Sequence, residues 1–143
     1  MPQLKPVIIA AAAYIAMTRH ALEGRPDEVC GCLIGRDGEQ NRQVLRVAAM
    51  ANVWPHPAER PHRFAIDPLE QMGVEAGLAS GESLLGFYHS HPASLAVPSA
   101  FDAKRAWPAY SYVIVSLLAD VPVIRCWEWA DDAFLEQAVM RTD

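Results

Sequence analysis

The sequence is poor in cysteine, and this shortage argues against a disulfide-stabilised protein and against a cysteine-bound structural zinc site. Its three cysteines are Cys30, Cys32 and Cys126. An odd number, with two of the three only two positions apart, does not suit a disulfide framework. Two closely spaced thiols are also too few for a structural zinc site, which takes four ligands. Free thiols fit a reducing compartment, so we expect a cytoplasmic protein.

The sequence also has no block of basic residues and carries a formal net charge of −5. This balance argues against nucleic acid or an anionic membrane as the main partner. Hydrophobic residues make up 52% of the 143 positions, which is enough for a substantial core. A chain of this length is expected to form one domain over residues 1–143.

No apolar run is long enough to span a bilayer, which takes about 20 residues. The longest, Val7–Met17, follows Lys5 and has two interpretations. It is either the core of a signal peptide or part of a buried first helix. We favour a helix over Val7–Leu22 that ends near Gly24 and Pro26.

Short apolar runs separated by turn signals predict a chain of mixed strands and helices. The turn at Asp37-Gly38 predicts a hairpin, and Asp67-Pro68 is a typical helix start. Three prolines between Asn52 and His62 predict a loop. The expected strands are Val29–Gly35, Gln43–Met50, Phe64–Ile66, Ser111–Leu118 and Val121–Trp129. The expected further helices are Asp67–Leu78, Ala100–Trp107 and the tail Asp131–Met140.

Two histidines stand two positions apart at the end of another apolar run. Leu84–Tyr88 predicts a buried strand that continues through His89 and ends at Pro92. Side chains two positions apart lie on one face of a strand, so His89 and His91 are expected to point the same way. Imidazole nitrogen is a common zinc ligand, but a His-x-His pair alone also occurs in strands that bind no metal.

A serine and an aspartate follow the two histidines after a short loop. Ser99 is a favourable N-cap for the helix Ala100–Trp107, and Asp102 lies in its first turn. Two imidazoles and a carboxylate form the three-ligand set of a catalytic zinc, whose fourth position is left to water. The same serine and acid also match a capping box, in which Asp102 binds the Ser99 N–H instead of a metal. The other histidines, His20, His56 and His62, are not expected to be ligands.

The spacing of these histidines, the serine and the aspartate resembles the JAMM motif of the MPN-domain metallopeptidases. Upstream, Glu28–Gly35 resembles that family's first-strand signature, a glutamate shortly before Cys-Gly and a hydrophobic run. The segments Phe64–Pro68 and Tyr112–Leu117 occur in the family's order, and the resemblance extends from about Ile8 to Trp129. It implies an α/β (α+β) fold, a single MPN-type domain whose curved mixed β-sheet is flanked by helices, as in the cytidine-deaminase-like fold.

The resemblance also implies roles for individual residues. His89, His91 and Asp102 match the zinc ligands, Glu28 the general acid and base, and Ser99 the residue whose hydroxyl steadies the oxyanion. Zinc lowers the pKa of a bound water molecule to about 7, and the glutamate takes its proton and passes it to the leaving amine. No position of the motif is missing, which indicates an active enzyme. Without the family pattern, Glu28 would be expected to be exposed, since it follows a polar turn.

Members of this family cleave amide bonds after the C-terminal Gly-Gly of ubiquitin or a ubiquitin-like protein. The chain lacks long insertions and resembles the compact prokaryotic branch, which processes ubiquitin-fold sulfur carriers by releasing cysteine or trimming C-terminal residues. An extended carrier tail is expected to pair with an exposed strand beside the metal. Two alternatives stay open: an isopeptidase that removes a ubiquitin-like protein from lysines of target proteins, and a non-catalytic MPN scaffold.

Overall fold

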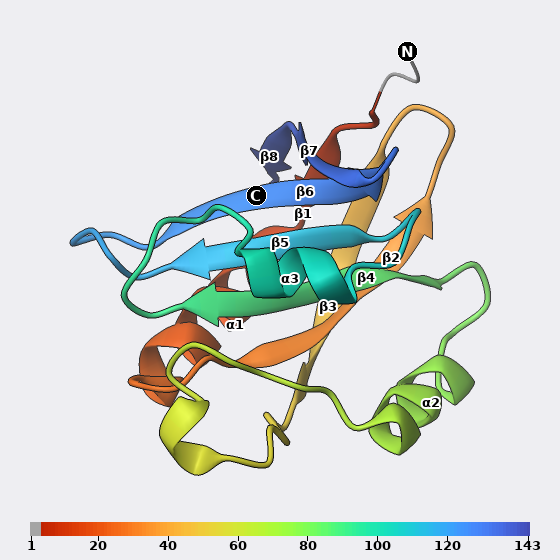
Figure 1. The fold of residues 1–143 in the computed structure, drawn as a ribbon. Helices are drawn as coiled ribbons and strands as arrows, with labels where there is room; N and C mark the ends of the chain where they lie inside the picture. The colour runs from red at the N-terminus through yellow and green to blue at the C-terminus, as the bar shows by residue number, and fades with distance from the viewer. Residues whose placement is uncertain (1–3) are drawn as a thin grey trace.

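A mixed eight-stranded sheet organises the computed structural model, which describes residues 4–143 (Figure 1). The first three residues of the expected 1–143 domain lie outside the described residues. The strands are β1 (Val7–Ile9), β2 (Cys30–Asp37), β3 (Arg42–Met50), β4 (Ser83–His91), β5 (Ser111–Ser116), β6 (Val123–Ala130), β7 (Ala133–Gln137) and β8 (Val139–Arg141). The helices are α1 (Ala11–Gly24), α2 (Pro68–Ala76) and α3 (Ala100–Arg105), with a 3₁₀ turn at Pro57–Glu59.

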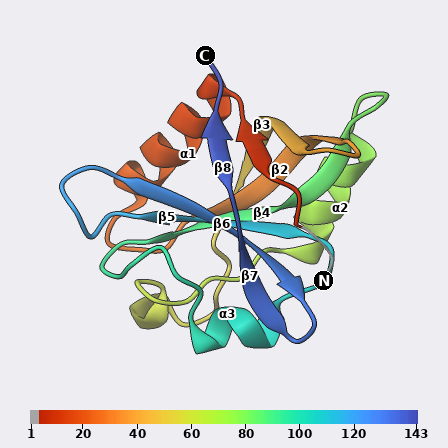
Figure 2. The ribbon, with the colours of Figure 1, turned by 90° about the horizontal axis from the view of Figure 1, so that it is seen from above.

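The sheet is strongly curved. Its strand order is β7-β6-β5-β4-β2-β3-β1-β8, so β7 and β8 stand at opposite edges. Only Ala138 separates these two strands in the chain, and Figure 2 shows β7 continuing directly into β8. The two edges therefore lie close together, and the sheet nearly closes on itself. This arrangement, with helices on the outside, confirms the expected α/β fold with a curved mixed sheet.

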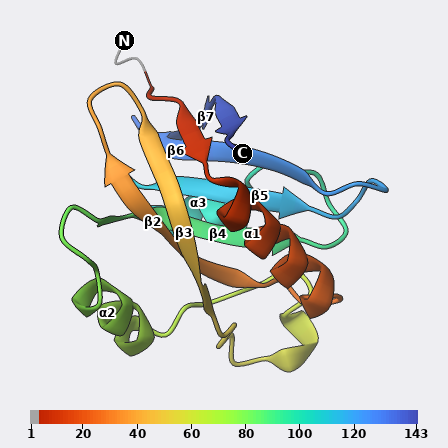
Figure 3. The same cartoon turned by 180° about the vertical axis from the view of Figure 1, so that it is seen from behind.

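Helix α1 covers one face of the sheet, and α3 lies on the opposite side (Figures 1 and 3). Ala13, Met17 and Ala21 recur at helical spacing and are fully or almost fully buried against strand residues such as Leu33 and Val113. Each large apolar side chain buried in this way contributes about 1.5–3 kcal/mol. A second apolar cluster on the other face contains Cys30, Cys32, Ile34, Met50 and Phe87.

Strand β4 lies at the centre of the sheet and determines which side chains reach each face. It pairs antiparallel with β2 and parallel with β5, and its register with β2 shifts beside Gly86. A side chain at Gly86 would overlap the carbonyl of Ser111, so only glycine fits this irregularity. Beyond it, Tyr88 joins the cluster under α1, whereas Phe87 joins the cluster on the opposite face.

Several sequence expectations are confirmed. Strand β3 pairs antiparallel with β2 across the predicted turn. Strands β5 and β6 form where two late strands were expected. Asp67 caps α2 by accepting a hydrogen bond from the N–H of Leu69 at 2.9 Å, with Pro68 at the first helical position. No helix within residues 4–143 has the length and apolar character needed to cross a membrane.

Three expectations are wrong. Residues Val7–Ile9 form β1 instead of the first turn of a helix, because they pair with β3 on one side and β8 on the other. Phe64–Ile66 is extended but forms no strand, and its one bond to another main-chain group runs from the Val53 N–H to the carbonyl of Ala65. The tail is two strands instead of a helix. Asp131 and Asp132 both have positive φ, which builds the tight turn between β6 and β7.

Candidate metal centre

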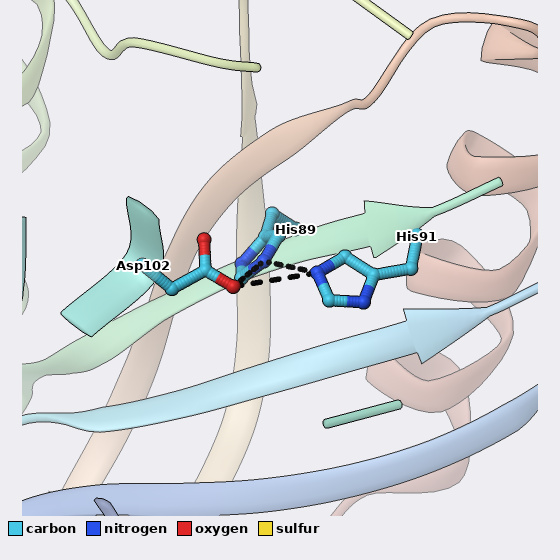
Figure 4. Close-up of side chains that lie close together, drawn as sticks. All are labelled: His89, His91 and Asp102. Atoms are coloured by element: carbon cyan, nitrogen blue, oxygen red, sulfur yellow. Dashed lines mark hydrogen bonds and ion pairs between the residues drawn. The ribbon is translucent and has the colours of Figure 1, made fainter. Parts of the chain in front are cut away.

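The two histidines at the end of β4 and one aspartate from α3 meet at a single point (Figure 4). The Nε2 atoms of His89 and His91 lie 3.1 Å apart. The Oδ2 atom of Asp102 lies 3.3 Å from Nε2 of His89 and 3.4 Å from Nε2 of His91. Both imidazoles are almost fully buried, as expected for side chains on the covered face of a central strand.

These separations fit a tetrahedral metal ion. With zinc–ligand bonds of about 2.0–2.2 Å, neighbouring ligand atoms of a tetrahedron lie about 3.3–3.6 Å apart. The three donor atoms are spaced at 3.1–3.4 Å, close to the corners of one tetrahedral face. Three protein ligands with a fourth position left over are typical of catalytic rather than structural sites.

Hydrogen bonding fixes which nitrogen of His91 faces the cluster. Its Nδ1 lies 2.7 Å from the carbonyl oxygen of Leu95, which can only accept. In the neutral imidazole, Nδ1 therefore carries the hydrogen, and Nε2 has the lone pair that a metal would bind. His89 is held differently: its ring stacks on Phe64 with centroids 4.6 Å apart. Its buried Nδ1 has no hydrogen-bond partner among residues 4–143.

Asp102 serves the capping box and the cluster with the same oxygen atom. Its Oδ2 accepts from the N–H of Ser99 at 2.9 Å, and Oγ of Ser99 accepts from the N–H of Asp102 at 3.0 Å. The sequence presents a capping box and a metal ligand as alternatives for Asp102, but the structure makes the two roles compatible. Burial raises the pKa of Asp102, but the charge of His89 and the hydrogen bonds from His89, His91 and the Ser99 N–H outweigh it and hold the pKa far below its usual value. Asp102 is thus ionised and can only accept, as the carboxylate of a metal site must.

Glu28 lies just before β2 and is 7% exposed, which excludes the exposed position that its polar neighbours suggest. Its own N–H donates to the carbonyl of Arg60 at 2.8 Å, and its carbonyl accepts from the side chain of Asn52 at 2.9 Å. Burial raises the pKa of Glu28 to about 8, against the opposing charge of His91 and with a smaller contribution from Asp102. A carboxyl group with this pKa can both take and return a proton near neutral pH.

The buried carboxyl makes the stability of the metal-free protein depend on pH. Because the folded protein binds this proton more tightly than the unfolded chain does, stability is lost as pH rises from about 4.5 to about 8. We expect Glu28→Gln to raise the free energy of unfolding by on the order of 3 kcal/mol above pH 8, and by less than about 1 kcal/mol at pH 5. Urea unfolding in chelator at both pH values measures this difference. An equal gain at the two pH values would contradict it.

An apolar pocket opens beside the ligand cluster, with His89 and Asp102 in its wall. Most of its lining is aromatic or aliphatic, and it comes from strands β4, β5 and β7, from helices α2 and α3, and from the segments next to these helices. The aromatic residues that line it are Phe64, Phe87, Phe101, Trp107, Tyr112 and Phe134. Such a pocket can hold an extended chain against the metal ligands while it keeps bulk water away.

The other histidines are not part of the group formed by His89, His91 and Asp102. His20 in α1 has its Nδ1 2.8 Å from the hydroxyl of Tyr88, under the opposite face of the sheet. Among residues 4–143, the group able to hold a metal contains none of His20, His56 and His62. Burial raises the pKa of Cys30 to about 12, so this thiol is not a nucleophile near neutral pH.

Sequence reasoning missed Asn52 and Arg63. The side chain of Asn52 bonds the Glu28 carbonyl, and the positive charge of Arg63 lowers the pKa of Glu28. Both residues lie in or next to the proline-rich segment that the sequence identifies only as a loop. No spacing rule singles them out, because their contacts with Glu28 span more than twenty positions of the chain.

The family model described as prokaryotic homologs of the JAB domain matches residues 10–130 of this chain. The desampylase of Haloferax volcanii is 39% identical over 137 residues, which cover 92% of this chain and 93% of that protein. The CysO-cysteine peptidase of Mycobacterium tuberculosis is 36% identical over 113 residues, 77% of this chain and 73% of the relative. A probable TtuB-protein conjugate cleaving protease of Thermus thermophilus is 38% identical over 96 residues, 66% of this chain and 60% of the relative.

The fold has a similar relative among solved structures. The solution structure of a protein from Desulfitobacterium hafniense matches with a TM-score of 0.84 and 33% identity, covering 96% of this chain and 93% of that one. The matched span 10–130 contains His89, His91 and Asp102 together with Glu28 and Ser99. The chain therefore belongs to the prokaryotic branch of the JAB-domain, or JAMM, metallopeptidases.

Proposed function

We propose that this chain is a zinc-dependent peptidase that hydrolyses the amide bond after the C-terminal Gly-Gly of a ubiquitin-like sulfur-carrier protein. It would release cysteine or trim C-terminal residues, working as one domain over residues 1–143. The observation that carries the proposal is the cluster of three donor atoms at tetrahedral separations, with a buried carboxyl group of raised pKa nearby. Names of relatives such as CysO-cysteine peptidase support the substrate class.

Residues His89, His91 and Asp102 would hold the zinc ion, which polarises a scissile carbonyl and makes water more acidic when it is bound. Glu28 would take the proton of the attacking water and then deliver it to the leaving amine. Its burial keeps the protonated form stable near neutral pH, so it can act in both directions. Glu28 stands outside the ligand group, as a proton carrier requires.

Ser99 has a hydrogen free for the developing oxyanion. A hydroxyl group has one donor and two acceptor positions, and the Ser99 oxygen already accepts from the N–H of Asp102. Its hydrogen can therefore point toward substrate without breaking the helix cap. Ser99 is exposed at the start of α3, next to the ligand that this helix supplies.

The carrier tail would have to lie across the apolar pocket instead of extending β4. Strand β4 is paired with β2 on one side and with β5 on the other, so β4 itself offers no open edge to the tail. The segment Arg63–Asp67 is extended and borders the pocket through Phe64 and Ile66. Two glycines at the end of the tail would let its backbone approach the ligand cluster closely.

An isopeptidase that removes a ubiquitin-like protein from lysines is the second candidate. The similarity to a protease named for cleaving TtuB-protein conjugates favours it. Both reactions break an amide bond after the same tail and differ only in the leaving amine. The non-catalytic scaffold is the weaker alternative, because the ligand cluster and the buried Glu28 have no role in it.

The test is mass spectrometry of a ubiquitin-fold sulfur carrier that bears extra residues after Gly-Gly. The carrier is incubated with zinc-loaded wild-type protein, with the Glu28→Gln variant and with wild-type protein in chelator. A loss of mass at Gly-Gly that requires both zinc and Glu28 supports the peptidase and identifies the leaving group. Cleavage only of a carrier joined to a lysine would support the isopeptidase, and no cleavage of either substrate would overturn both.

Ser99→Ala is expected to keep its zinc and to lower kcat on the order of 10²-fold, because one oxyanion donor is lost. The same substitution also removes a helix cap worth about 1 kcal/mol. Ser99→Gly is the matched control, since glycine caps helices almost as well as serine but has no hydroxyl. Equal losses in the two variants identify the hydroxyl as the cause. Restored turnover in Ser99→Gly would reduce Ser99 to a capping role.

A further inference from the structure

Asn52 lies two residues beyond the end of β3, and its side-chain amide binds four backbone groups around Glu28. Its Nδ2 donates to the carbonyl of Glu28 at 2.9 Å and to the carbonyl of Arg63 at 3.0 Å. Its Oδ1 accepts from the N–H of Trp54 at 3.1 Å and from the N–H of Ala65 at 3.3 Å. Both donor hydrogens and both acceptor positions of the amide are therefore used.

These bonds continue the contact between β2 and β3 beyond its last paired residues, Cys30 and Met50. Glu28 precedes β2, and the chain between Asn52 and Ala65 contains no strand. The N–H of Glu28 donates to Arg60 of the same loop, so its peptide groups are held on both sides by this one segment. Asn52 in turn holds the loop itself, because its amide ties the start of the loop to its end.

The same loop reaches the helix that supplies the aspartate ligand. The guanidinium of Arg63 lies 4.2 Å from the ring centroid of Phe101 in α3, next to Asp102. Trp54 packs edge-on against the same ring, with centroids 5.3 Å apart. Asn52 therefore stands at the junction between the main chain of Glu28 and the segment that packs on α3.

We infer that Asn52 is a positioning residue, which fixes the main chain of Glu28 so that its carboxyl group faces the ligand cluster. Only the expected effect of Asn52 on turnover rests on the proposed peptidase function. The clamp itself is a property of the fold. Asparagine suits the position because two carbonyls need donors and two N–H groups need an acceptor at one point. Aspartate would place an oxygen against both carbonyls, and alanine would leave all four groups without this partner.

The test compares Asn52→Asp and Asn52→Ala with the control Asn41→Asp. Asn41 lies in the turn between β2 and β3, at the far end of the hairpin from Asn52, and the control makes the same chemical change there. Zinc content is expected to stay near one ion per chain in all variants. We expect kcat to fall roughly 10- to 100-fold in both Asn52 variants, with KM changing less than about threefold, because small misplacements of a reacting group are costly.

Amide hydrogen exchange gives a measurement that does not depend on activity. The N–H of Glu28 is expected to exchange at least about tenfold faster in both Asn52 variants, while the N–H of Val113 in the central strand β5 is unchanged. The Val113 reference separates local release of Glu28 from general loss of stability. Asn41→Asp is expected to change neither amide.

Two outcomes overturn the inference. Unchanged exchange at Glu28 in a folded Asn52 variant shows that the clamp does not hold this residue, whatever the activity. Faster exchange with unchanged kcat shows that the clamp has no effect on turnover. If wild-type protein cleaves no carrier, the proposed function fails, but the exchange measurement still decides whether Asn52 holds Glu28. If Asn52→Ala does not fold, the nearly isosteric Asn52→Asp carries both measurements.

Discussion

Asp102→Ala is expected to leave the purified protein without its metal ion and without hydrolytic activity. The substitution removes one of three donor atoms that lie within 3.4 Å of one another, and it removes the negative charge of the cluster. Replacing residues that only support metal ligands already costs 10- to 100-fold in metal affinity or activity, so loss of a ligand should cost more. Zinc content is expected to fall from about one ion per chain to near zero.

The control for this prediction is Asp67→Ala. Asp67 caps α2 as Asp102 completes the capping box of α3, so its loss costs a similar helix-cap energy without changing the ligand cluster. Asp67→Ala is expected to keep its zinc. If Asp102→Ala retained one zinc ion per chain after dialysis, the ligand assignment would be wrong and Asp102 would be a capping residue only.

Glu28→Gln is expected to have the opposite combination: normal zinc content with hydrolysis reduced on the order of 10²- to 10⁴-fold. Glutamine has nearly the same shape but cannot carry a proton between water and the leaving amine. Glu28 lies outside the group of donor atoms, so its replacement does not remove a ligand. Zinc content and turnover of the Gly-Gly carrier, measured on the same preparation, test the expected metal binding and the expected loss of hydrolysis.

Glu39→Gln is the matched control, because it makes the same change in the exposed turn between β2 and β3. It is expected to behave as wild type. Full activity in Glu28→Gln would assign the proton transfer to another group. The two largest predictions also separate enzyme from scaffold, since a scaffold would keep its partner binding in both Asp102→Ala and Glu28→Gln and show no turnover in any variant.

The ligand cluster was largely predictable because it depends on local rules. Alternation along a strand places His89 and His91 on one face, and the Ser99 cap places Asp102 in the first turn of α3. Only eight residues separate the end of β4 from the start of α3, so the order of the motif limits the possible geometry. The burial of Glu28 did not follow from its neighbours. It was expected only from the family pattern, because a polar turn usually faces water.

The C-terminal tail and the first strand show where local reasoning fails. Val7–Ile9 and Val139–Arg141 are three-residue strands whose partners lie far along the chain, so their hydrogen bonds come from tertiary pairing. Their short apolar patterns do not distinguish a strand from a helix turn. Strand β8 pairs with β1 at one edge of the sheet. The sheet can therefore nearly close only when both Val7–Ile9 and Val139–Arg141 are strands.

By itself, the sequence determined the type and order of the central elements, the shared face of the two histidines and the capped helix that carries Asp102. Each of these depends on residues within one strand, one turn or one helix end. Only the tertiary structure decided that one oxygen of Asp102 serves both the cap and the cluster, that Glu28 is buried, and that Asn52 holds its main chain. These features depend on packing and hydrogen bonds between distant segments, whose relative positions are fixed only when the curved sheet has formed.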